Sequence, residues 1–187
     1  MFGRQQGESM NHVIAIGTPH FASENTLILE VRRKSGNTDS FICIAENIDI
    51  ASFTSASKIE ISGEINFREK AGHQEMYISI LDAIEHNPDE HYENSVMLRG
   101  IICRRPYHKR VCNNKASLTS TILKVGSTYV PVIFWGADAK RCKRLPDGTE
   151  ICVEGRLQSR IYTKHMDTGN VEKGITYEVS VNEMLII

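Results

Sequence analysis

Hydrophobic and polar residues alternate along most of this chain, with the period of two that is typical of β-strands. Ten segments have this pattern, five in each half: 11–17, 26–33, 40–47, 58–68 and 76–81, then 94–100, 117–125, 129–136, 150–160 and 176–181. Only residues 47–57 and 137–145 have a length and composition compatible with a helix. The pattern therefore predicts an all-β chain with two short helices.

The five segments of the first half recur in the second half in the same order. The motif NHVIAIG at 11–17 recurs as NSVMLRG at 94–100, and KIEISGEINFR at 58–68 aligns without a gap with EICVEGRLQSR at 150–160. The second alignment matches a central glycine and a final arginine. A repeat of about 90 residues that contains five strands is a complete small barrel and not one unit of a solenoid.

The positions of the two helices indicate which barrel this is. In both copies the helix falls between the third and fourth strands, where a five-stranded Greek-key barrel of the oligonucleotide-binding (OB) type carries its helix. We therefore predict an all-β fold with two tandem OB-fold barrels, each with a short helix. The expected organisation is a flexible N-terminus at 1–10, a first domain at 11–84, a polar linker at 85–93 and a second domain at 94–187.

The formal net charge of −1 hides two halves of opposite sign. Residues 1–93 carry 7 Lys and Arg against 15 Asp and Glu, whereas residues 94–187 carry 15 against 8. The formal net charge is therefore −8 for the first half and +7 for the second. A basic half predicts a polyanionic partner, because its cations cluster around aromatic residues. Mutual attraction of the two halves is the alternative explanation.

Aromatic and basic residues are concentrated between Tyr129 and Tyr162. Trp135 follows Phe134 in an alternating strand, so one ring points into the core and the other points away from it. Unpaired bases stack on exposed rings, and Lys and Arg neutralise the phosphates. The segment therefore predicts binding of a single-stranded nucleic acid. The alternatives are a subunit or domain interface for Trp135 and packing on its own barrel for Tyr162.

Basic residues near these rings are candidate phosphate contacts. Arg156 and Arg160 alternate with apolar residues beside Tyr162, which favours phosphate contacts over a solvated surface, and the cations of the helix at 137–145 are weaker candidates. Residues 104–116 and 163–174 are expected to form long mobile loops that fold over a bound strand. The predicted nucleic-acid-binding residues are Tyr129, Trp135, Tyr162, Arg156, Arg160, Arg105, Tyr107, Lys109, Arg110 and Lys164.

The second half also carries an ordered set of motif residues. They are Asn94, Val96, Leu98 and Gly100, then Tyr129 to Trp135 with Gly136, then Ala139, Leu145 and Gly148, and finally Val153, Glu154, Gly155, Arg156, Leu157, Arg160 and Tyr162. Taken together, this set resembles the OB domain of bacterial single-stranded DNA-binding proteins. The resemblance covers residues 94–185, about half of the chain.

The resemblance implies that Tyr129, Trp135 and Tyr162 stack on the bases of single-stranded DNA. It also implies a role in replication, recombination or repair. Family members with two barrels per chain dimerise, so a homodimer is expected here. RNA stays open as a ligand, because neither rings nor cations detect a 2′-hydroxyl group.

The end of the chain departs from the family pattern. Family members usually end in a linker and an acidic tip that closes on Pro-Phe and recruits replication and repair proteins, whereas this chain ends on the letters MLII. If that end is natural, we expect a specialised relative, such as a primosome component or a protein of a plasmid, phage or other mobile element.

The first copy departs from the family in its rings and its charge. It has Asn47 or a neighbouring polar residue where the second copy has Trp135, and Lys70 where the second has Tyr162. Phe41 and Phe67 are its remaining candidate rings. A negative barrel repels phosphates, so the first copy is interpreted as a degenerate barrel that pairs with another barrel, stabilises the second domain or contacts a protein.

Other function classes find less support in the sequence. It contains no Ser-His-Asp set, Walker loop, HExxH or paired-carboxylate pattern, so an enzyme is not expected. Its five cysteines include no CxxC, so we expect neither a metal site nor a cofactor. No apolar run approaches membrane-spanning length and the N-terminus lacks a secretory signal, which predicts a cytoplasmic protein without a membrane. A protein-interaction scaffold is the alternative to nucleic-acid binding, because it would explain the acidic half.

Overall fold

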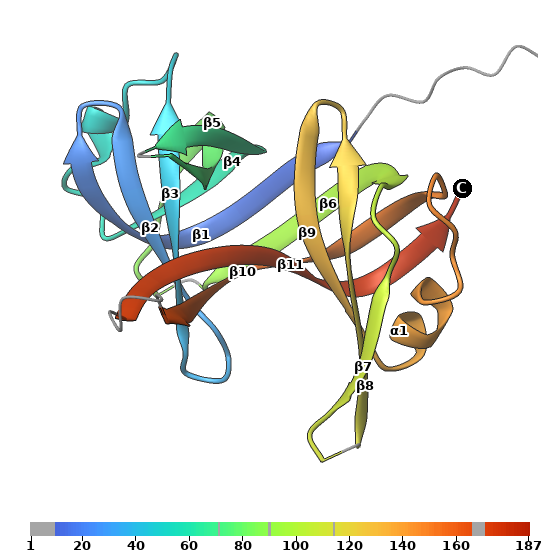
Figure 1. Ribbon diagram of the computed structural model, residues 1–187. Coiled ribbons are helices and arrows are strands. Elements are labelled where there is room, and N and C mark those ends of the chain that lie inside the picture. Colours follow the sequence, from blue (N-terminus) through green and yellow to red (C-terminus); the bar gives the residue numbers. More distant parts are fainter. Residues whose placement is uncertain (1–9, 71, 90, 114, 166–170) are drawn as a thin grey trace, which may run out of the picture.

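The structure, a computed structural model, describes residues 10–70, 72–89, 91–113, 115–165 and 171–187, and for residues 162–165 and 171–173 it describes the backbone alone. Within these residues eleven strands join in one sheet (Figure 1). The strands of the first half are β1 (Asn11–Ser23), β2 (Thr26–Arg32), β3 (Thr38–Ala45), β4 (Lys58–Lys70) and β5 (His73–His86). Those of the second half are β6 (Glu93–Ile102), β7 (Tyr107–Val111), β8 (Ala116–Val125), β9 (Thr128–Trp135), β10 (Glu150–His165) and β11 (Val171–Ile186).

The strand pairings close into a circuit in each half. In the first half β1 pairs with β2, β2 with β3, β3 with β5, β5 with β4, and β4 with β1. In the second half the order is β6, β8, β9, β11, β10 and back to β6. In both circuits the third pairing is parallel and the others are antiparallel. The predicted all-β fold is confirmed, and a closed five-stranded barrel of this strand order is consistent with the OB type.

Each of the two predicted helices is shorter than expected. The segment 47–57 contains only η1 (Ile50–Phe53), one turn of 3-10 helix that begins after Asp49. The segment 137–145 contains α1 (Gly136–Cys142), whose Ala139 and Cys142 are buried. The hydroxyl of Thr119 on β8 donates to the carbonyl of Ala139 at 2.7 Å, so α1 packs against the inner side of the sheet.

Matching residues make matching contacts in the two halves. The Asn11 side chain donates to the carbonyl of Ile65 at 2.8 Å and accepts from its amide at 3.0 Å. Asn94 makes the same two bonds to Leu157, at 2.6 and 2.9 Å. The asparagine therefore joins β1 to β4 in the first half and β6 to β10 in the second, where the sequence alignment places equivalent residues.

Two glycines lie where another strand approaches too closely for a side chain. Gly63 on β4 and Gly155 on β10 each sit at a register shift. A Cβ atom at Gly63 would lie 2.3 Å from the carbonyl oxygen of Ser79, and one at Gly155 would lie 2.3 Å from that of Ser180. These bends let the sheet close on itself.

Two sets of contacts hold the halves together. Strands β1 and β6 pair antiparallel from Asn11 and Leu98 to Ile16 and Glu93, which makes the sheet continuous between the halves. The second set centres on Asp39 of β3, which is completely buried.

The Asp39 carboxylate binds both its own half and the other. It accepts from Nε of Arg33 at 2.6 Å, and from the amide of Ser159 on β10 at 2.8 Å and its hydroxyl at 3.1 Å. The hydrogen bond to Asp39 is the main cause that raises the pKa of the Arg33 guanidinium. Since a buried polar group is costly without partners, these bonds offset the cost of burying Asp39 between the halves.

We expect Gly63→Ala to lower the free energy of unfolding by about 2 to 3 kcal/mol, because its methyl group would collide with a backbone carbonyl that cannot turn away. Urea denaturation measures this change. Ser95→Ala on β6 is the control, with an expected change of about 0.5 kcal/mol or less. Equal stability of the two variants would show that the strands can separate at this point.

Asp39→Asn is expected to destabilise the protein by about 2 to 4 kcal/mol, because it leaves the charge of Arg33 without its partner. The Arg33 side chain is only 20% exposed, so water cannot fully replace the carboxylate. Arg32→Gln, next to it but exposed, should leave the melting temperature nearly unchanged. Similar melting temperatures for the two variants would contradict the role given to Asp39.

Candidate nucleic-acid interface

One face of the second-half sheet gathers exposed rings and cations. Residues that pair across neighbouring strands point to the same side of a sheet. Tyr107 on β7 pairs with Ser120, Ser120 with Ile133, and Ile133 with Ser180. Ser180 in turn pairs with Arg156. One row of side chains therefore runs across five strands, from a tyrosine at one end to an arginine at the other.

Two further rows lie on the same side. Lys109 pairs with Leu118, and Leu118 pairs with Trp135. Lys124 pairs with Tyr129, and its Nζ lies 6.0 Å from the centre of the tyrosine ring. We call this surface the ring face; its rings and cations are Tyr107, Lys109, Lys124, Tyr129, Trp135, Arg156 and Arg160.

The rings of this face are accessible. Tyr107 is 65% exposed, Tyr129 53% and Trp135 41%, whereas the neighbouring Phe134 is fully buried. The two faces of β9 are therefore divided as the alternation predicts. Since Trp135 is open to solvent within the chain, it is not buried between the two halves.

A buried acid organises the arginine side of the ring face. Glu178 on β11 is 9% exposed and accepts from the Gln158 amide at 2.8 Å. The Arg160 guanidinium lies 3.7 Å from the other oxygen of Glu178. Arg156 donates to the uncharged oxygen of Gln158 at 3.3 Å. Arg160 is therefore partly neutralised by Glu178, whereas the contact of Arg156 leaves its positive charge uncompensated.

Not every predicted residue lies on this face. Arg110 alternates with Lys109 on β7 and donates to the Ser117 hydroxyl at 3.3 Å, so it points to the opposite side. Arg105 is exposed in the connection between β6 and β7, outside the strand pairings. The side chains of Tyr162 and Lys164 lie outside the described residues.

The two predicted mobile loops are shorter than expected. Residues 104–116 contain strand β7, which pairs with β8 along its whole length, so the expectation of a long loop was wrong there. Within 163–174, β10 continues to His165 and β11 begins at Val171. Pairing with a neighbouring strand stabilises segments that look too polar to be strands on their own.

The first half has no matching ring at either of the two equivalent β3 positions. Cys43 pairs with Ile78 as Val132 pairs with Val179, so β3 and β9 can be compared residue by residue. The position of Trp135 is taken by Glu46, one residue before the predicted Asn47. At this position the first half therefore has a negative charge in place of a stacking surface.

The two candidate rings of the first half are not equivalent to those of the ring face. Ser40 takes the position of Tyr129 by the same comparison. Phe41 is 1% exposed and belongs to the core, so the suggestion that it is a free ring was wrong. Phe67 is partly buried and packs against the core.

Lys124 is a ring-face residue that the sequence analysis missed. The signal was present, because the two strands around the turn at Gly126 and Ser127 place Lys124 opposite Tyr129. A single lysine in an apolar strand is otherwise easily interpreted as a solvated residue.

The part of the chain that the structure describes also bears on metal sites and membrane-spanning helices. There, no group of three or more His, Cys, Asp or Glu is placed to hold a metal ion. None of the helices described is long and apolar enough to cross a membrane.

Two solved structures of a protein from Thermus aquaticus share this fold. The wild-type single-stranded DNA binding protein from Thermus aquaticus has a TM-score of 0.70 and 14% identity, over 97% of this chain and 94% of its own. A deletion mutant of that protein has a TM-score of 0.69 and 16% identity, over 96% of this chain and 95% of its own. The SSB domain of a Synechococcus protein has a TM-score of 0.40 and 20% identity, over 51% of this chain and 97% of its own. No protein-family model and no curated protein matches the sequence.

Positive charge extends around β7 to its other side. His108 lies next to Thr119, with 2.8 Å between Nδ1 and the hydroxyl oxygen. Desolvation, followed by the charges of Lys143, Arg110 and Lys140, lowers the pKa of His108 below its ordinary value. The neutral ring is favoured because a proton there would be repelled.

We expect Lys143→Gln to raise the pKa of His108, because Lys143 makes the largest of the three charge contributions. Following the ring protons of His108 by NMR as the pH is changed measures the shift. Lys34→Gln, in the other half, should leave this pKa unchanged. An unchanged pKa in Lys143→Gln would contradict the contribution assigned to the charge of Lys143.

Proposed function

We propose that this protein binds single-stranded nucleic acid, specifically single-stranded DNA, through the ring face of its second half. The observation that carries the proposal is the register of β7, β8, β9, β11 and β10, which aligns exposed rings and cations on one side of one sheet. Each base offers a flat surface to a ring, and each phosphate a charge to an arginine or lysine. Such a surface binds with little regard to sequence, since every base can stack.

Within this proposal the residues have separate tasks. Trp135 and Tyr129 stack on bases from one strand, β9, and Tyr107 adds a ring from β7. Lys109, Lys124 and Arg156 contact phosphates, while Arg160 exchanges its contact with Glu178 for a phosphate. Tyr162, Lys164 and Arg105 extend the surface at its edges, and Arg110 contacts phosphates from the other side of β7.

The choice of DNA has two supports. The sequence motifs of the second half resemble those of bacterial single-stranded DNA-binding proteins, and the structural neighbours from Thermus aquaticus are single-stranded DNA binding proteins. The ring face itself has the chemistry to bind either nucleic acid, because stacking and charge neutralisation do not require a deoxyribose.

The proposal extends to the organisation of the chain. The two closed strand circuits act as two tandem OB barrels, residues 11–84 and 94–187, of which the second carries the ring face. The first has kept the barrel and has exchanged Trp135 for Glu46. Two such chains associate as a homodimer and serve in DNA replication, recombination or repair.

Trp135→Ala is expected to weaken binding of a dT oligomer by about 1 to 3 kcal/mol, because one stacking surface is removed. Fluorescence polarisation of a labelled oligomer measures the affinity. In the wild-type protein, stacking should also quench the fluorescence of Trp135, the only tryptophan in the chain.

Two controls accompany this measurement. Trp135→Phe should retain most of the affinity, because it keeps a ring at this position. Affinity should fall steeply with added salt, as counterions are released from the bound strand. A wild-type protein that shows neither quenching nor a salt dependence would contradict the proposal and favour the interaction scaffold.

A further inference from the structure

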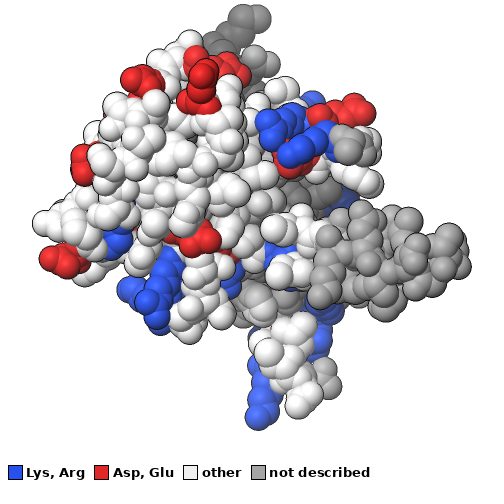
Figure 2. Space-filling view, turned by 90° about the vertical axis from the view of Figure 1, so that its left-hand side faces the viewer, with Lys and Arg blue, Asp and Glu red and all other residues white. Residues whose placement is uncertain are grey.

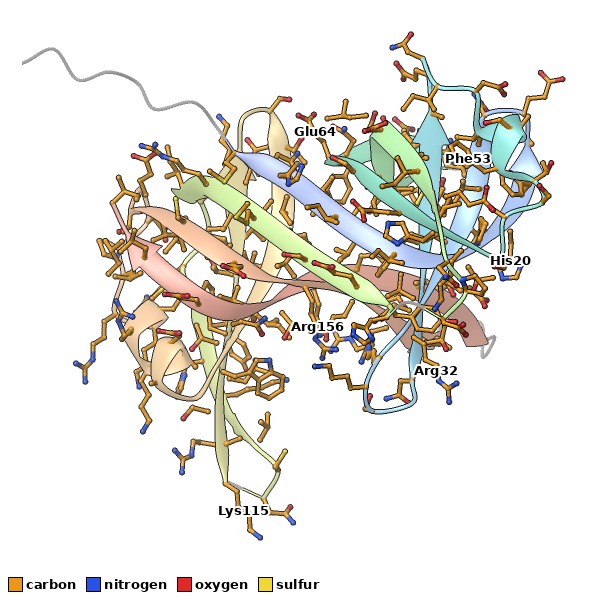
Figure 3. All side chains as sticks on the ribbon, turned by 180° about the vertical axis from the view of Figure 1, so that it is seen from behind. His20, Arg32, Phe53, Glu64, Lys115 and Arg156 are labelled. Atoms are coloured by element: carbon orange, nitrogen blue, oxygen red, sulfur yellow. The ribbon has the colours of Figure 1, made fainter. Side chains whose placement is uncertain are left out.

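A second basic surface lies between the two halves, next to the ring face. It is a groove of about 540 Å³, whose charged and aromatic lining residues are Arg32, Arg33, Lys34, Tyr92, Glu93 and Arg156. We call it the junction groove. Figure 3 shows Arg156 between the hairpin that ends near Lys115 and the connection that follows Arg32.

The groove is basic, although most of its cations come from the first half of the chain, which is acidic overall. Three consecutive basic residues, Arg32 to Lys34, lie at the end of β2 and the start of the β2–β3 connection in the acidic first half. Figure 2 shows many acidic residues over the upper part of that half, and basic residues toward its lower edge. The net charge of −8 therefore does not describe the potential in the groove.

Two of these first-half cations are available to a ligand. Among the residues that the structure describes, Arg32 and Lys34 form no ion pair, and both are exposed. Arg33 is occupied by Asp39. Within the described part of the chain, Arg156 is hydrogen-bonded to the neutral amide of Gln158 and forms no ion pair, so the lining of the groove has three positive charges without an ion-pair partner and one acid, Glu93.

The groove also contains a ring. Tyr92 is 37% exposed, and Nζ of Lys58 lies 4.3 Å from the centre of its ring. A ring beside cations is the combination that single-stranded nucleic acids require. Tyr92 falls in the linker predicted at 85–93, and no role was expected for it there.

Arg156 belongs to both surfaces. It ends the ring-face row that begins at Tyr107, and it also lines the junction groove. The β2–β3 connection and the β7–β8 hairpin project toward the same side of the molecule (Figure 1). A strand that leaves the ring face at Arg156 therefore reaches Arg32 and Lys34 without crossing to another side of the protein.

The basic connection is held in place by the other half. Arg33 binds Asp39, and Asp39 accepts from the amide and hydroxyl of Ser159 on β10. Ser159 is three residues from Arg156 on the same strand. The contact that joins the halves thus sets Arg32 and Lys34 beside Arg156 before any ligand binds, which reduces the entropy lost on binding.

We infer that the junction groove is a second binding segment for the same single strand. Arg32 and Lys34 contact its phosphates, and Tyr92 contacts a base. This inference rests on the proposed function, because the strand enters the groove from the ring face. The first half then takes part in binding through its β2–β3 connection, although its own barrel face lacks the rings.

The test compares two dT oligomers with the full chain. One OB fold covers about 4 to 16 nucleotides, so an oligomer of about 8 should occupy the ring face and one of about 30 should reach the groove as well. For the double variant Arg32→Gln/Lys34→Gln, the Kd of the long oligomer should rise about threefold to tenfold. The slope of log K against log salt should fall by about 1.4, because two phosphates are no longer neutralised by the protein.

Three comparisons make the result specific. Affinity for the short oligomer and its quenching of Trp135 should not change in the double variant. Lys143→Gln/Arg144→Gln removes the same charge at the end of α1, outside both surfaces, and should have a smaller effect on the long oligomer. Tyr92→Leu should weaken binding of the long oligomer without a change in salt slope.

The outcomes separate the two proposals. Suppose that the wild type binds both oligomers, and that the Arg32→Gln/Lys34→Gln variant has the same Kd and salt slope as the Lys143→Gln/Arg144→Gln control. The junction groove is then not a binding segment, whereas the proposal for the ring face is unaffected. If the wild type binds neither oligomer, the proposed function fails and this inference fails with it.

Discussion

The antiparallel pairing of β1 with β6 determines how every other part of this molecule is arranged. It runs from Asn11 and Leu98 to Ile16 and Glu93, and at its centre Val13 lies opposite Val96, both fully buried. Because a strand pairing leaves little freedom of rotation, it fixes one half of the chain relative to the other. The long β10–β11 hairpin can then reach the first half, where Ser159 meets the buried carboxylate of Asp39. Without the first contact, the second would have no defined geometry.

The two halves share the residues that closure of the strand circuit requires, and they differ in the side chains that face solvent. Gly63 and Gly155 lie too close to a neighbouring carbonyl to carry a side chain, and this restriction is the same in both halves. The outward positions of β3 and β9 carry no such restriction. Glu46 and Trp135 occupy the same place on the two strands, and either is compatible with the packing beneath it. The two halves therefore differ in the side chains that they expose, while the architecture beneath is shared.

Much of the fold follows from local sequence, because alternation, helix position and strand glycines are local signals. The opposite directions of Phe134 and Trp135 could also be predicted, since they need only the period of a strand. The strand at 107–111 could not, because its polar residues become a strand only through pairing with β8. The junction groove could not be predicted from the sequence either. Arg32 and Lys34 look like solvated residues of an acidic domain, and only a contact between distant parts of the chain places them near Arg156.

Net charge is a poor guide to what a surface binds, and this chain shows why. At physiological ionic strength, exposed charges act over about 8 Å, so a phosphate senses the few side chains around it and not the sum over a domain. In the junction groove those side chains are Arg32, Lys34 and Arg156, with Glu93 as the opposing acid. On the outward face of β3 the corresponding neighbour is Glu46. One acidic half can therefore present a negative charge on the outward face of its β3 strand and positive charges at the connection that faces the other half. The position of a charge in the fold, set by β1, β6 and Asp39, decides which sign of charge a given surface presents.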